Sequence, residues 1–512
     1  MCRLILMRDI GIVVSSSHGP IAYNYWIGVR AMLRITLREG PGELPLHRQI
    51  ADQIHFQIEQ GDIVDGTLLP STRNLARELG IARGTVVLAY EELCAAGTCE
   101  SRVGRGTSAN GPKRPAKTSR DANRPRRSRK LLLEIPNEPV DIDPGAVSLL
   151  PSIADTGHLP ITALRRGFDK VLRRPTHLKE FTESAGDPLL RRLICQRILP
   201  QRGIDADPSE VLVVPGTQYG SLLLAMTLAE SRKTFHFGEP GYLDFARNFA
   251  RFGFSLRSHP VDASGVAAPI SSLGEQDVLY VMPEHHFPQC VSLSGTRRRT
   301  IIRAVEQDGL LVIEDDYDSE FYYNRRPQPA LKSNDESGGV VYLGTFSKSL
   351  FNSLRLGYIV ASPELISELA TLHWSLSRGT SGILQRWVAE LISEGTIESH
   401  VQRMRTVYRR RRDKIATLLE REFPEWRITI PQGGLQFFIE TGNSKEANEV
   451  IEACRLHRLR VALPSSYVMP GSTRQNFFVL GFGSAPFQEI ERSLLKVKQS
   501  LKELQAYRKE GC

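Results

Sequence analysis

Two charged residues at the ends of apolar segments define the chemistry that this sequence could support. Lys348 closely follows the apolar run 340–343, and Asp315 closely follows the run 310–313. If both runs are strands of one sheet, their carboxyl ends meet at the same edge. A lysine amine can form an imine with an aldehyde, and a carboxylate can keep a pyridine nitrogen protonated. A pyridoxal phosphate site needs both groups, because the ring then acts as an electron sink.

The residues around Asp315 indicate which side chains could share one ligand. Successive side chains of a strand point to opposite faces. Asp315 and Tyr317 therefore reach one ligand together, and Glu314 and Asp316 lie on the other face. Two adjacent aspartates also suggest a metal pair, but no histidine cluster accompanies them. We predict an organic cofactor at this position and no metal.

Groups suited to a phosphate and a flat ring occur on both sides of this segment. The run 211–214 ends near a glycine that opens a helix, whose free N–H groups favour a phosphate dianion. Hydroxyls beside the lysine and an arginine seven residues beyond it add phosphate contacts, and a tyrosine loop could cover the ring. Each feature alone is ordinary: a surface lysine, a helix cap or a core tyrosine. The candidates are Gly216, Thr217, Gln218, Thr345, Ser347, Arg355 and Tyr242.

A different pattern occupies the first hundred residues. Apolar residues recur every four positions between Pro45 and Gly61, which predicts a helix. Ser71 can cap a second helix over 73–79, and Gly80 ends it with the tight turn of a helix-turn-helix. A third helix over about 82–96 and a glycine-containing hairpin over 99–108 follow. We predict a winged helix-turn-helix, although a small domain for protein contact would share this pattern.

In a helix-turn-helix the start of the second helix of the motif enters the major groove of double-stranded DNA. Arg83 and Thr85 lie at that start, where base and phosphate contacts arise. Arg73 begins the first helix, where a phosphate contact is natural, and Arg102 and Arg105 lie on the wing. These five residues are the predicted contacts to an operator.

Length, composition and the pattern of apolar runs predict the domains and strands that carry these residues. A chain of 512 residues with 41% apolar content can form a small module and a large α/β domain. From residue 146, short apolar runs alternate with longer amphipathic segments, which predicts a mostly parallel sheet with helices on both faces. The expected strands are 211–214, 234–237, 278–282, 310–313, 340–343 and 358–361. The expected parts are an N-terminal extension over 1–40, the winged module over 41–107, a linker over 108–145, a large domain over 146–399 and a smaller α+β subdomain over 400–506.

Charge, cysteine usage and the lengths of the apolar runs argue against a disulfide-stabilised protein and against a membrane-spanning one. Nine basic residues face one acid between Gly111 and Lys130, nearly the whole net charge of +9, which favours a solvated linker that also attracts phosphates. Seven scattered cysteines without a Cys-x-x-Cys pair suit free thiols in the cytoplasm. We find no apolar run of about 18 residues and expect no membrane segment. Residues 1–40 fit no element well, and Met32 is an alternative start of translation, so residues 1–31 need not be translated.

The helical module resembles the winged helix of the GntR family. The resemblance lies in Leu46–Ile50, Leu69–Arg73, Leu75–Gly80 and Thr85-Val86 with Ala89–Leu93. One departure is that Ala82-Arg83-Gly84-Thr85 stands where the family often has Ser-Arg-Asn-Thr. Gly84 offers no side chain to a base and weakens the helix start, so we expect a different operator.

Residues 146–506 resemble the fold-type I aminotransferases, and the chain from residue 41 resembles the MocR subfamily of GntR regulators. The resemblance implies that Lys348 is the Schiff-base lysine, that Asp315 pairs with the pyridinium and that Tyr317 bonds the ring hydroxyl. It implies that Tyr242 stacks on the ring and that the remaining candidates form a phosphate cup. His285, in a loop similar to the family's Pro-Ser-His-Gln-Phe-Pro, would lie near the ring. A homodimer and a small amino compound as effector are also implied.

Two functions follow from these features. The first is a transcriptional regulator that senses pyridoxal 5'-phosphate, or an amino compound joined to it. The second is an aminotransferase with a DNA-binding tether, in which Lys348 would also carry the proton. Aminotransferases usually hold the substrate carboxylate with an arginine in a strand near the C-terminus, where this chain has Val479. Arg474 and Arg247 lie nearby without matching a motif, so we favour the regulator.

Overall fold

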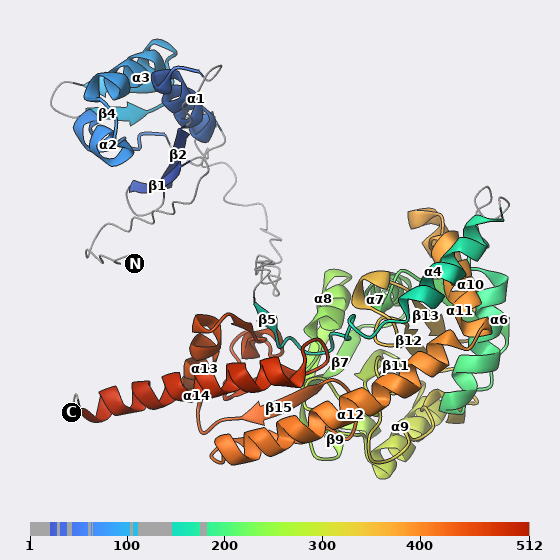
Figure 1. Cartoon of the computed structure of the whole chain (residues 1–512). Coiled ribbons are helices and arrows are strands. Elements are labelled where there is room, and N and C mark those ends of the chain that lie inside the picture. Colours follow the sequence, from blue (N-terminus) through green and yellow to red (C-terminus); the bar gives the residue numbers. More distant parts are fainter. Residues whose placement is uncertain are drawn as a thin grey trace. The chain divides into compact units, whose positions relative to one another are not determined.

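The computed structural model describes residues 21–27, 31–37, 44–59, 63, 65–102, 106–110, 146–174 and 182–510. The chain divides into two compact units, Met1–Arg127 and Ser128–Cys512, and each is treated by itself (Figure 1). None of the helices in these residues is long and apolar enough to span a bilayer.

The first unit contains the expected helix-turn-helix and wing. The helices are α1 (Leu46–Glu59), α2 (Thr72–Leu79) and α3 (Arg83–Ala95), and the wing is the antiparallel pair β3 (Cys99–Arg102) and β4 (Gly106–Ala109). Ser71 caps α2 by accepting a hydrogen bond from the Asn74 N–H, and Gly80 ends the helix in the left-handed region at φ 66°. The spacing of four in α1 places Ile50, Ile54 and Ile58 in the core of this unit.

A strand pair precedes α1, which differs from the expectation that residues 1–40 fit no element. Strand β1 (Ile21–Ile27) pairs antiparallel with β2 (Ala31–Leu37). Leu33 and Ile35 are buried in the same core as the helices. Apolar residues at alternate positions of β2 cover the helices, and this short period-two pattern was overlooked beside the irregular sequence before it. Residues 1–20 lie outside the described residues, as does most of the predicted linker, whose first residues belong to β4.

The second unit is built on a large sheet with the order β6-β13-β12-β11-β10-β7-β8-β9, eight strands among the described residues. The pairs within β8-β7-β10-β11-β12 are parallel, whereas β13 is antiparallel to β12 and β6, and β9 is antiparallel to β8. The predicted mostly parallel sheet is confirmed. The strands are β6 (Val211–Val214), β7 (Thr234–Glu239), β8 (Ser255–Asp262), β9 (Gly265–Val266), β10 (Asp277–Val281), β11 (Leu311–Asp316), β12 (Val340–Thr345) and β13 (Gly357–Val360).

Helices cover both faces of this sheet because its central strands are apolar on both sides. Leu311 and Ile313 of β11 pack with the helices α7 (Thr217–Leu228), α8 (Leu243–Arg251) and α10 (Pro363–Ser377). Val312, between them, packs on the opposite face with α9 (Gly295–Asp308). That face also carries α4 (Ile161–Leu172), α6 (Pro188–Leu193), α11 (Gly382–Ser393) and α12 (Thr396–Glu422).

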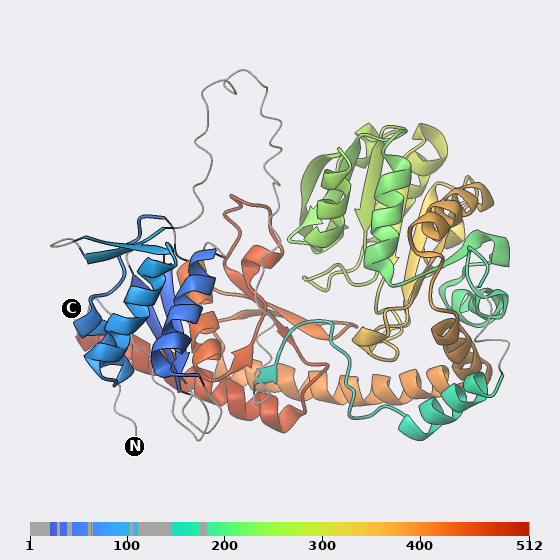
Figure 2. The ribbon, with the colours of Figure 1, turned by 90° about the horizontal axis from the view of Figure 1, so that it is seen from above.

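The C-terminal part forms the predicted smaller α+β subdomain. Its antiparallel sheet contains β14 (Arg427–Thr429), β15 (Gln436–Glu440) and β17 (Phe477–Gly481), with helices α13 (Ser444–Leu456) and α14 (Phe487–Glu510). The short strands β5 (Val147–Ser148) and β16 (Leu459–Arg460) pair in parallel, which ties the start of this unit to its end. Figure 2 shows the long helix α12 in orange, running from the helices beside the large sheet to the small sheet.

Candidate functional site

A cavity of about 180 Å³ lies at the carboxyl ends of β11 and β12 and the start of α7. It brings together nine of the eleven predicted cofactor residues; Gly216 and His285 lie beside it. It also contains four residues that the sequence prediction did not include. The lining consists of Thr217, Gln218, Tyr242, Asp315, Tyr317, Thr345, Ser347, Lys348 and Arg355, together with Ser152, Met282, Phe287 and Asn352.

Asp315 presents a carboxylate oxygen that lacks a partner. Its Oδ2 accepts a hydrogen bond from the Tyr280 hydroxyl at 2.6 Å. Its Oδ1 is buried and has no hydrogen-bond partner among the described residues. Burial raises the pKa of this carboxyl to about 7, and the Tyr280 hydroxyl opposes the shift. A buried acceptor without a donor is costly, so this oxygen is suited to a donor brought by a ligand, such as a protonated ring nitrogen.

Lys348 follows β12 and lines the same cavity. Its Nζ donates a hydrogen bond to the Ser152 carbonyl at 2.5 Å. Burial lowers the pKa of this amine to about 8, and the carboxylates of Asp318, Glu320 and Asp315 oppose the shift. An amine that is partly neutral near pH 7 is a better nucleophile than an ordinary lysine.

The third side of the cavity is built for an anion. Gly216 precedes α7 with a φ of 87°, and α7 has no side-chain cap, so its first N–H groups remain available. A Cβ on Gly216 would lie 3.1 Å from Nη2 of Arg355, which places the guanidinium at this helix start. Arg355 itself adopts the left-handed region at φ 51°, a strained conformation for a residue other than glycine. The Thr345 hydroxyl accepts a hydrogen bond from the Ser347 N–H at 3.1 Å and orders the adjacent turn.

Aromatic rings border the space between these groups. Tyr242, at the start of α8, meets Phe287 edge to face with ring centroids 6.0 Å apart. Tyr317 also meets Phe287 edge to face, at 6.0 Å. A flat heterocycle between Asp315 and Lys348 would therefore contact aromatic surface.

His285 is held close to this cavity without lining it. Its carbonyl accepts a hydrogen bond from the Tyr317 hydroxyl at 3.0 Å, and its Nδ1 lies 2.8 Å from Oδ1 of Asp318. Burial lowers the pKa of the imidazole, but the Asp318 carboxylate outweighs burial and the net shift is upward. His285 therefore acts on the cavity through Tyr317, whose hydroxyl also accepts a hydrogen bond from Gln436 at 3.2 Å.

Ser152 and Asn352 are the polar residues of the cavity that the sequence prediction missed. The Ser152 carbonyl accepts hydrogen bonds from Lys348 and from Nδ2 of Asn352, the latter at 3.3 Å. Ser152 has a positive φ of 57°. No local pattern marks Ser152, because it meets Lys348 only where a distant segment crosses the strand ends. Asn352 lies four residues beyond the lysine, and that proximity was its only signal.

Asp316 points away from this cavity, as the alternation along β11 predicts. Its Oδ2 forms a buried ion pair with Nε of Arg202 at 2.6 Å and accepts a hydrogen bond from the Tyr342 hydroxyl at 2.7 Å. Asp315 and Asp316 therefore cannot share one metal ion. Arg202 ends the short helix η4 (Leu199–Arg202) on the other face of the sheet.

An arginine for a substrate carboxylate does not line the described part of the cavity, apart from Arg355 at its anion end. Val479 is fully buried in β17 opposite Phe438. Arg474 lies 3.8 Å from Glu440, and Arg247 pairs with Asp244 at 2.6 Å. Neither arginine lines the cavity.

In the first unit, the predicted DNA contacts gather where α2 and α3 begin. Arg73 and Arg83 are exposed, and Nε of Arg83 lies 3.4 Å from the Thr72 hydroxyl. Thr85 is half-buried in the first turn of α3. The residue before α3 is Ala82, which provides no side-chain cap. Two helix starts with exposed arginines form a surface that attracts phosphates.

The wing is described only in part. Arg102 is exposed and forms two hydrogen bonds with the Glu100 carboxylate, at 3.0 and 3.2 Å. It must therefore exchange this partner to reach a phosphate. Arg105 lies outside the described residues.

These observations define a class: a winged helix-turn-helix joined to a domain of the aminotransferase fold. Comparisons support both parts. Residues 46–108 match the family described as bacterial regulatory proteins, gntR family, and residues 154–477 match aminotransferase class I and II. The second match covers most of the second unit.

Relatives with both parts identify the family. The chain is 30% identical to the HTH-type transcriptional regulator TauR of Rhodobacter capsulatus over 90% of this chain and 97% of TauR. It is 30% identical to the probable rhizopine catabolism regulatory protein MocR of Rhizobium meliloti over 76% of this chain and 80% of MocR. The pyridoxine biosynthesis regulator PdxR of Corynebacterium glutamicum is 29% identical over 85% of this chain and 91% of PdxR. The chain belongs to this MocR-type group of gntR regulators, which carry an aminotransferase domain.

Solved structures support the fold of the second unit. The kynurenine aminotransferase of Pyrococcus horikoshii aligns with a TM-score of 0.64 at 21% sequence identity. The alignment covers 70% of this chain and 91% of the aminotransferase. The α-aminoadipate aminotransferase LysN of Thermus thermophilus aligns with a TM-score of 0.64 at 24% sequence identity. That alignment covers 71% of this chain and 94% of LysN. At these identities the likeness shows the fold alone.

Proposed function

We propose that the second unit binds pyridoxal 5'-phosphate and a small amino compound, and that this binding controls how the winged helix binds double-stranded operator DNA. The observation that carries the proposal is the buried Oδ1 of Asp315, which has no hydrogen-bond partner among the described residues and lies in the same cavity as the amine of Lys348. An aldehyde-bearing pyridine with an anionic tail satisfies the orphan oxygen, the amine and the start of α7 together. The relative PdxR is named for pyridoxine biosynthesis, which agrees with this ligand class.

Each residue of the cavity is assigned a different contact with such a cofactor. Lys348 holds it covalently, Asp315 pairs with the ring nitrogen and Tyr317 contacts the ring hydroxyl. Tyr242 covers the ring. The phosphate lies at the start of α7 with Gly216, Thr217, Gln218, Thr345, Ser347 and Arg355. Once bound, the cofactor supplies an electrophilic carbon for amines and an electron sink.

The effector is recognised mainly through its amino group. The Ser152 carbonyl and the Asn352 amide provide polar contacts next to Lys348. Within the described lining, Arg355 is the only arginine, and the phosphate occupies it. An α-carboxylate therefore finds no free arginine in the described lining, which favours regulation over efficient transamination. An active aminotransferase is the alternative function, and the second experiment below distinguishes it from a regulator.

DNA recognition is assigned to the helix starts of the first unit. Arg83 and Thr85 contact base edges, and Arg73 and the wing contact phosphates. A homodimer would present two such modules to two half-sites. An effector regulates only if it binds two arrangements of the modules with different affinity.

The first test locates the cofactor. Full-length protein is incubated with pyridoxal phosphate, reduced with borohydride and digested, and mass spectrometry identifies the modified peptide. We expect the modification on Lys348 and none at this site in Lys348→Ala. Modification of another lysine, or none, contradicts the proposal.

The second test asks whether a change at the cofactor site alters the affinity for DNA. Fluorescence anisotropy measures binding to the fragment upstream of the protein's own gene, with and without candidate amines. We expect an amine that changes the cofactor absorbance to change DNA affinity as well. Arg83→Ala should weaken operator binding by roughly 1–3 kcal/mol, with less effect on random DNA. Steady release of a keto acid, with DNA affinity unchanged, would establish the aminotransferase instead.

A further inference from the structure

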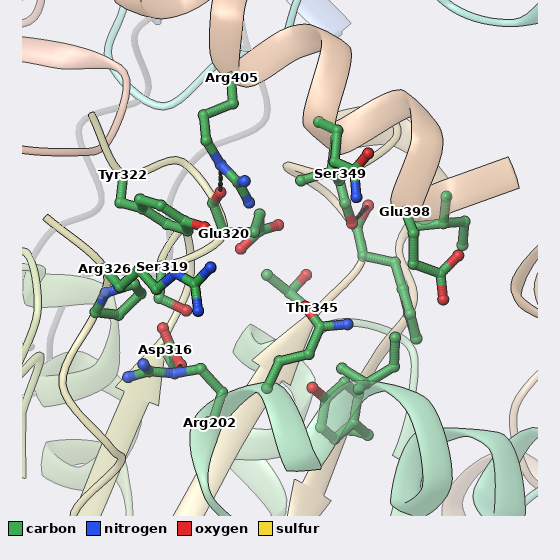
Figure 3. Close-up of a pocket in the computed structure, with 18 of the residues that line it drawn as sticks. Arg202, Asp316, Ser319, Glu320, Tyr322, Arg326, Thr345, Ser349, Glu398 and Arg405 are labelled. Atoms are coloured by element: carbon green, nitrogen blue, oxygen red, sulfur yellow. Dashed lines mark hydrogen bonds and ion pairs between the residues drawn. The ribbon is translucent and has the colours of Figure 1, made fainter. Parts of the chain in front are cut away.

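A second and larger cavity lies on the other side of the strand ends that carry Lys348. It measures about 410 Å³ and is bordered by α12, the segment 316–327, the region 198–202 and the turn after β12 (Figure 3). Asp316 lines it, whereas Asp315 lines the cofactor cavity. A volume of this size accommodates a small organic molecule.

Two arginines lie beside an acidic residue on one side of this cavity. Figure 3 shows Arg405 and Arg326 near Glu320. Nε of Arg405 donates to the Glu320 carbonyl at 3.0 Å, and its guanidinium lies 3.9 Å from the centroid of the Tyr322 ring. Stacking and this single bond hold Arg405 in place and leave its terminal nitrogens available. Arg326 and the Glu320 carboxylate form no ion pair with any described residue.

A second carboxylate lies across the cavity. Glu398, near the start of α12, has a buried Oε2 without a hydrogen-bond partner in the described structure. Figure 3 places it on the side opposite Arg326 and Glu320. A buried carboxylate oxygen without a donor carries a desolvation cost that a bound cation would offset.

Part of the remaining wall is apolar or aromatic, and the rest carries polar residues such as Gln201, Ser319 and Gln402. The apolar and aromatic residues are Ile198 of the helical segment Ile194–Ile198, Phe346 of the turn after β12, Tyr358 of β13, and Ile397 and Val401 of α12. The lining therefore combines an apolar surface with groups of both charges. An ion that is purely anionic or purely cationic would leave one set unpaired.

We propose that this cavity is a second ligand site, and that its ligand is a zwitterionic amino acid with an apolar side chain. The carboxylate of the ligand pairs with Arg405 and Arg326. Its ammonium group pairs with Glu320 or Glu398, and its side chain packs against the apolar wall. This site is separate from the cofactor cavity and does not depend on the function proposed above.

The turn after β12 separates the two cavities. Thr345 lines both, Phe346 and Ser349 line the second, and Ser347 and Lys348 line the first. Electrostatics also connect them: burial raises the pKa of Glu320 to about 8, and in its ionised form Glu320 raises the pKa of Lys348. An ammonium group that pairs with Glu320 would oppose this effect and favour the neutral amine.

The test is isothermal titration calorimetry of the full-length protein with L-phenylalanine, 2-phenylethylamine and 3-phenylpropionate. The last two probes each lack one charge of the first. We expect saturable binding of L-phenylalanine and binding about tenfold weaker, or worse, for each analogue, the loss that follows when a charged partner is removed. Absence of saturable binding of L-phenylalanine overturns the proposal.

Matched variants assign the site. Arg405→Gln and Glu320→Gln should each weaken L-phenylalanine binding by about tenfold or more. Arg409→Gln and Glu420→Gln, at exposed positions of the same helix α12, should leave it unchanged. Lys348→Ala should also retain it. Binding that is lost in Lys348→Ala but kept in Glu320→Gln would place the ligand in the cofactor cavity and refute the second site. Circular dichroism of each variant verifies folding, and the isosteric Glu320→Gln remains decisive if Arg405→Gln does not fold.

Discussion

The amine of Lys348 should react with pyridoxal phosphate at a much lower pH than an ordinary lysine. Burial lowers its pKa to about 8. At pH 7.5 such an amine is about one quarter neutral, whereas a lysine of unperturbed pKa is neutral to about 0.1%. Since only the neutral amine attacks an aldehyde, attachment should be about 200-fold faster than the pKa of free lysine would allow.

The assay follows attachment of the cofactor to the apoprotein between pH 6 and 10. Pyridoxal phosphate is added in excess, and the rate is taken from the change in absorbance. Rates are divided by those of Nα-acetyl-lysine under the same conditions, which removes the ionisations of pyridoxal phosphate itself. We expect the protein rate to rise about tenfold per pH unit at low pH and to level off above about pH 8, whereas the reference continues to rise towards about pH 10. Lys348→Ala should lack this phase.

The direction in which Glu320 shifts the pKa of Lys348 can be tested by substitution. The ionised form of Glu320, whose own pKa burial raises to about 8, raises the pKa of Lys348. Glu320→Gln removes that charge, so the plateau should begin at a lower pH, whereas the exposed Glu420→Gln should leave it unchanged. A wild-type plateau near pH 10, or a shift to higher pH in Glu320→Gln, would refute the assignment of a buried, nearly neutral amine.

Three further predictions concern stability, each measured by urea unfolding. Asp316→Asn breaks the buried pair with Arg202 and should destabilise the second unit by about 3–5 kcal/mol, whereas Asp315→Asn, which removes no ion pair, should cost much less. Gly84→Ala should stabilise the first unit by about 0.5–1 kcal/mol, because Gly84 is helical and a Cβ there meets open space. Leu33→Ala should destabilise the first unit by about 2–5 kcal/mol, because Leu33 is buried against the helices; no loss would mean that β2 contributes nothing to this core.

The central strands could be predicted from the sequence because they are buried on both faces. Such strands read as continuous apolar runs, and the predicted run 340–343 lies within the central strand β12. β8 could not be predicted in this way. It lies near the edge of the sheet, and its residues Ser255–Asp262 are mostly exposed or half-buried, so their composition resembles that of a loop. The strand pair β1-β2 was missed because its role depends on packing against helices that come later in the chain.

The candidate site was predictable where it depends on local alternation. The period of two along β11 places Asp315 in one cavity and Asp316 in the other, and the structure agrees. Contacts between distant segments were not predictable. Ser152 meets Lys348 across 196 positions of sequence, and Arg202 meets Asp316 across 114. Such pairs are set by how the chain crosses the strand ends, which no local pattern records.

The same alternation gives the molecule a means of coupling two ligands. Asp315 and Asp316 are neighbours on one strand but serve opposite cavities, and Thr345 lines both. A ligand on either side therefore acts on one shared turn and on the charge balance around Lys348. Thermodynamic linkage requires the effect to be reciprocal. If L-phenylalanine changes the affinity for pyridoxal phosphate by some factor, the cofactor must change the affinity for L-phenylalanine by that factor. Two independent titrations that disagree would show that the cavities are not coupled through this turn at equilibrium.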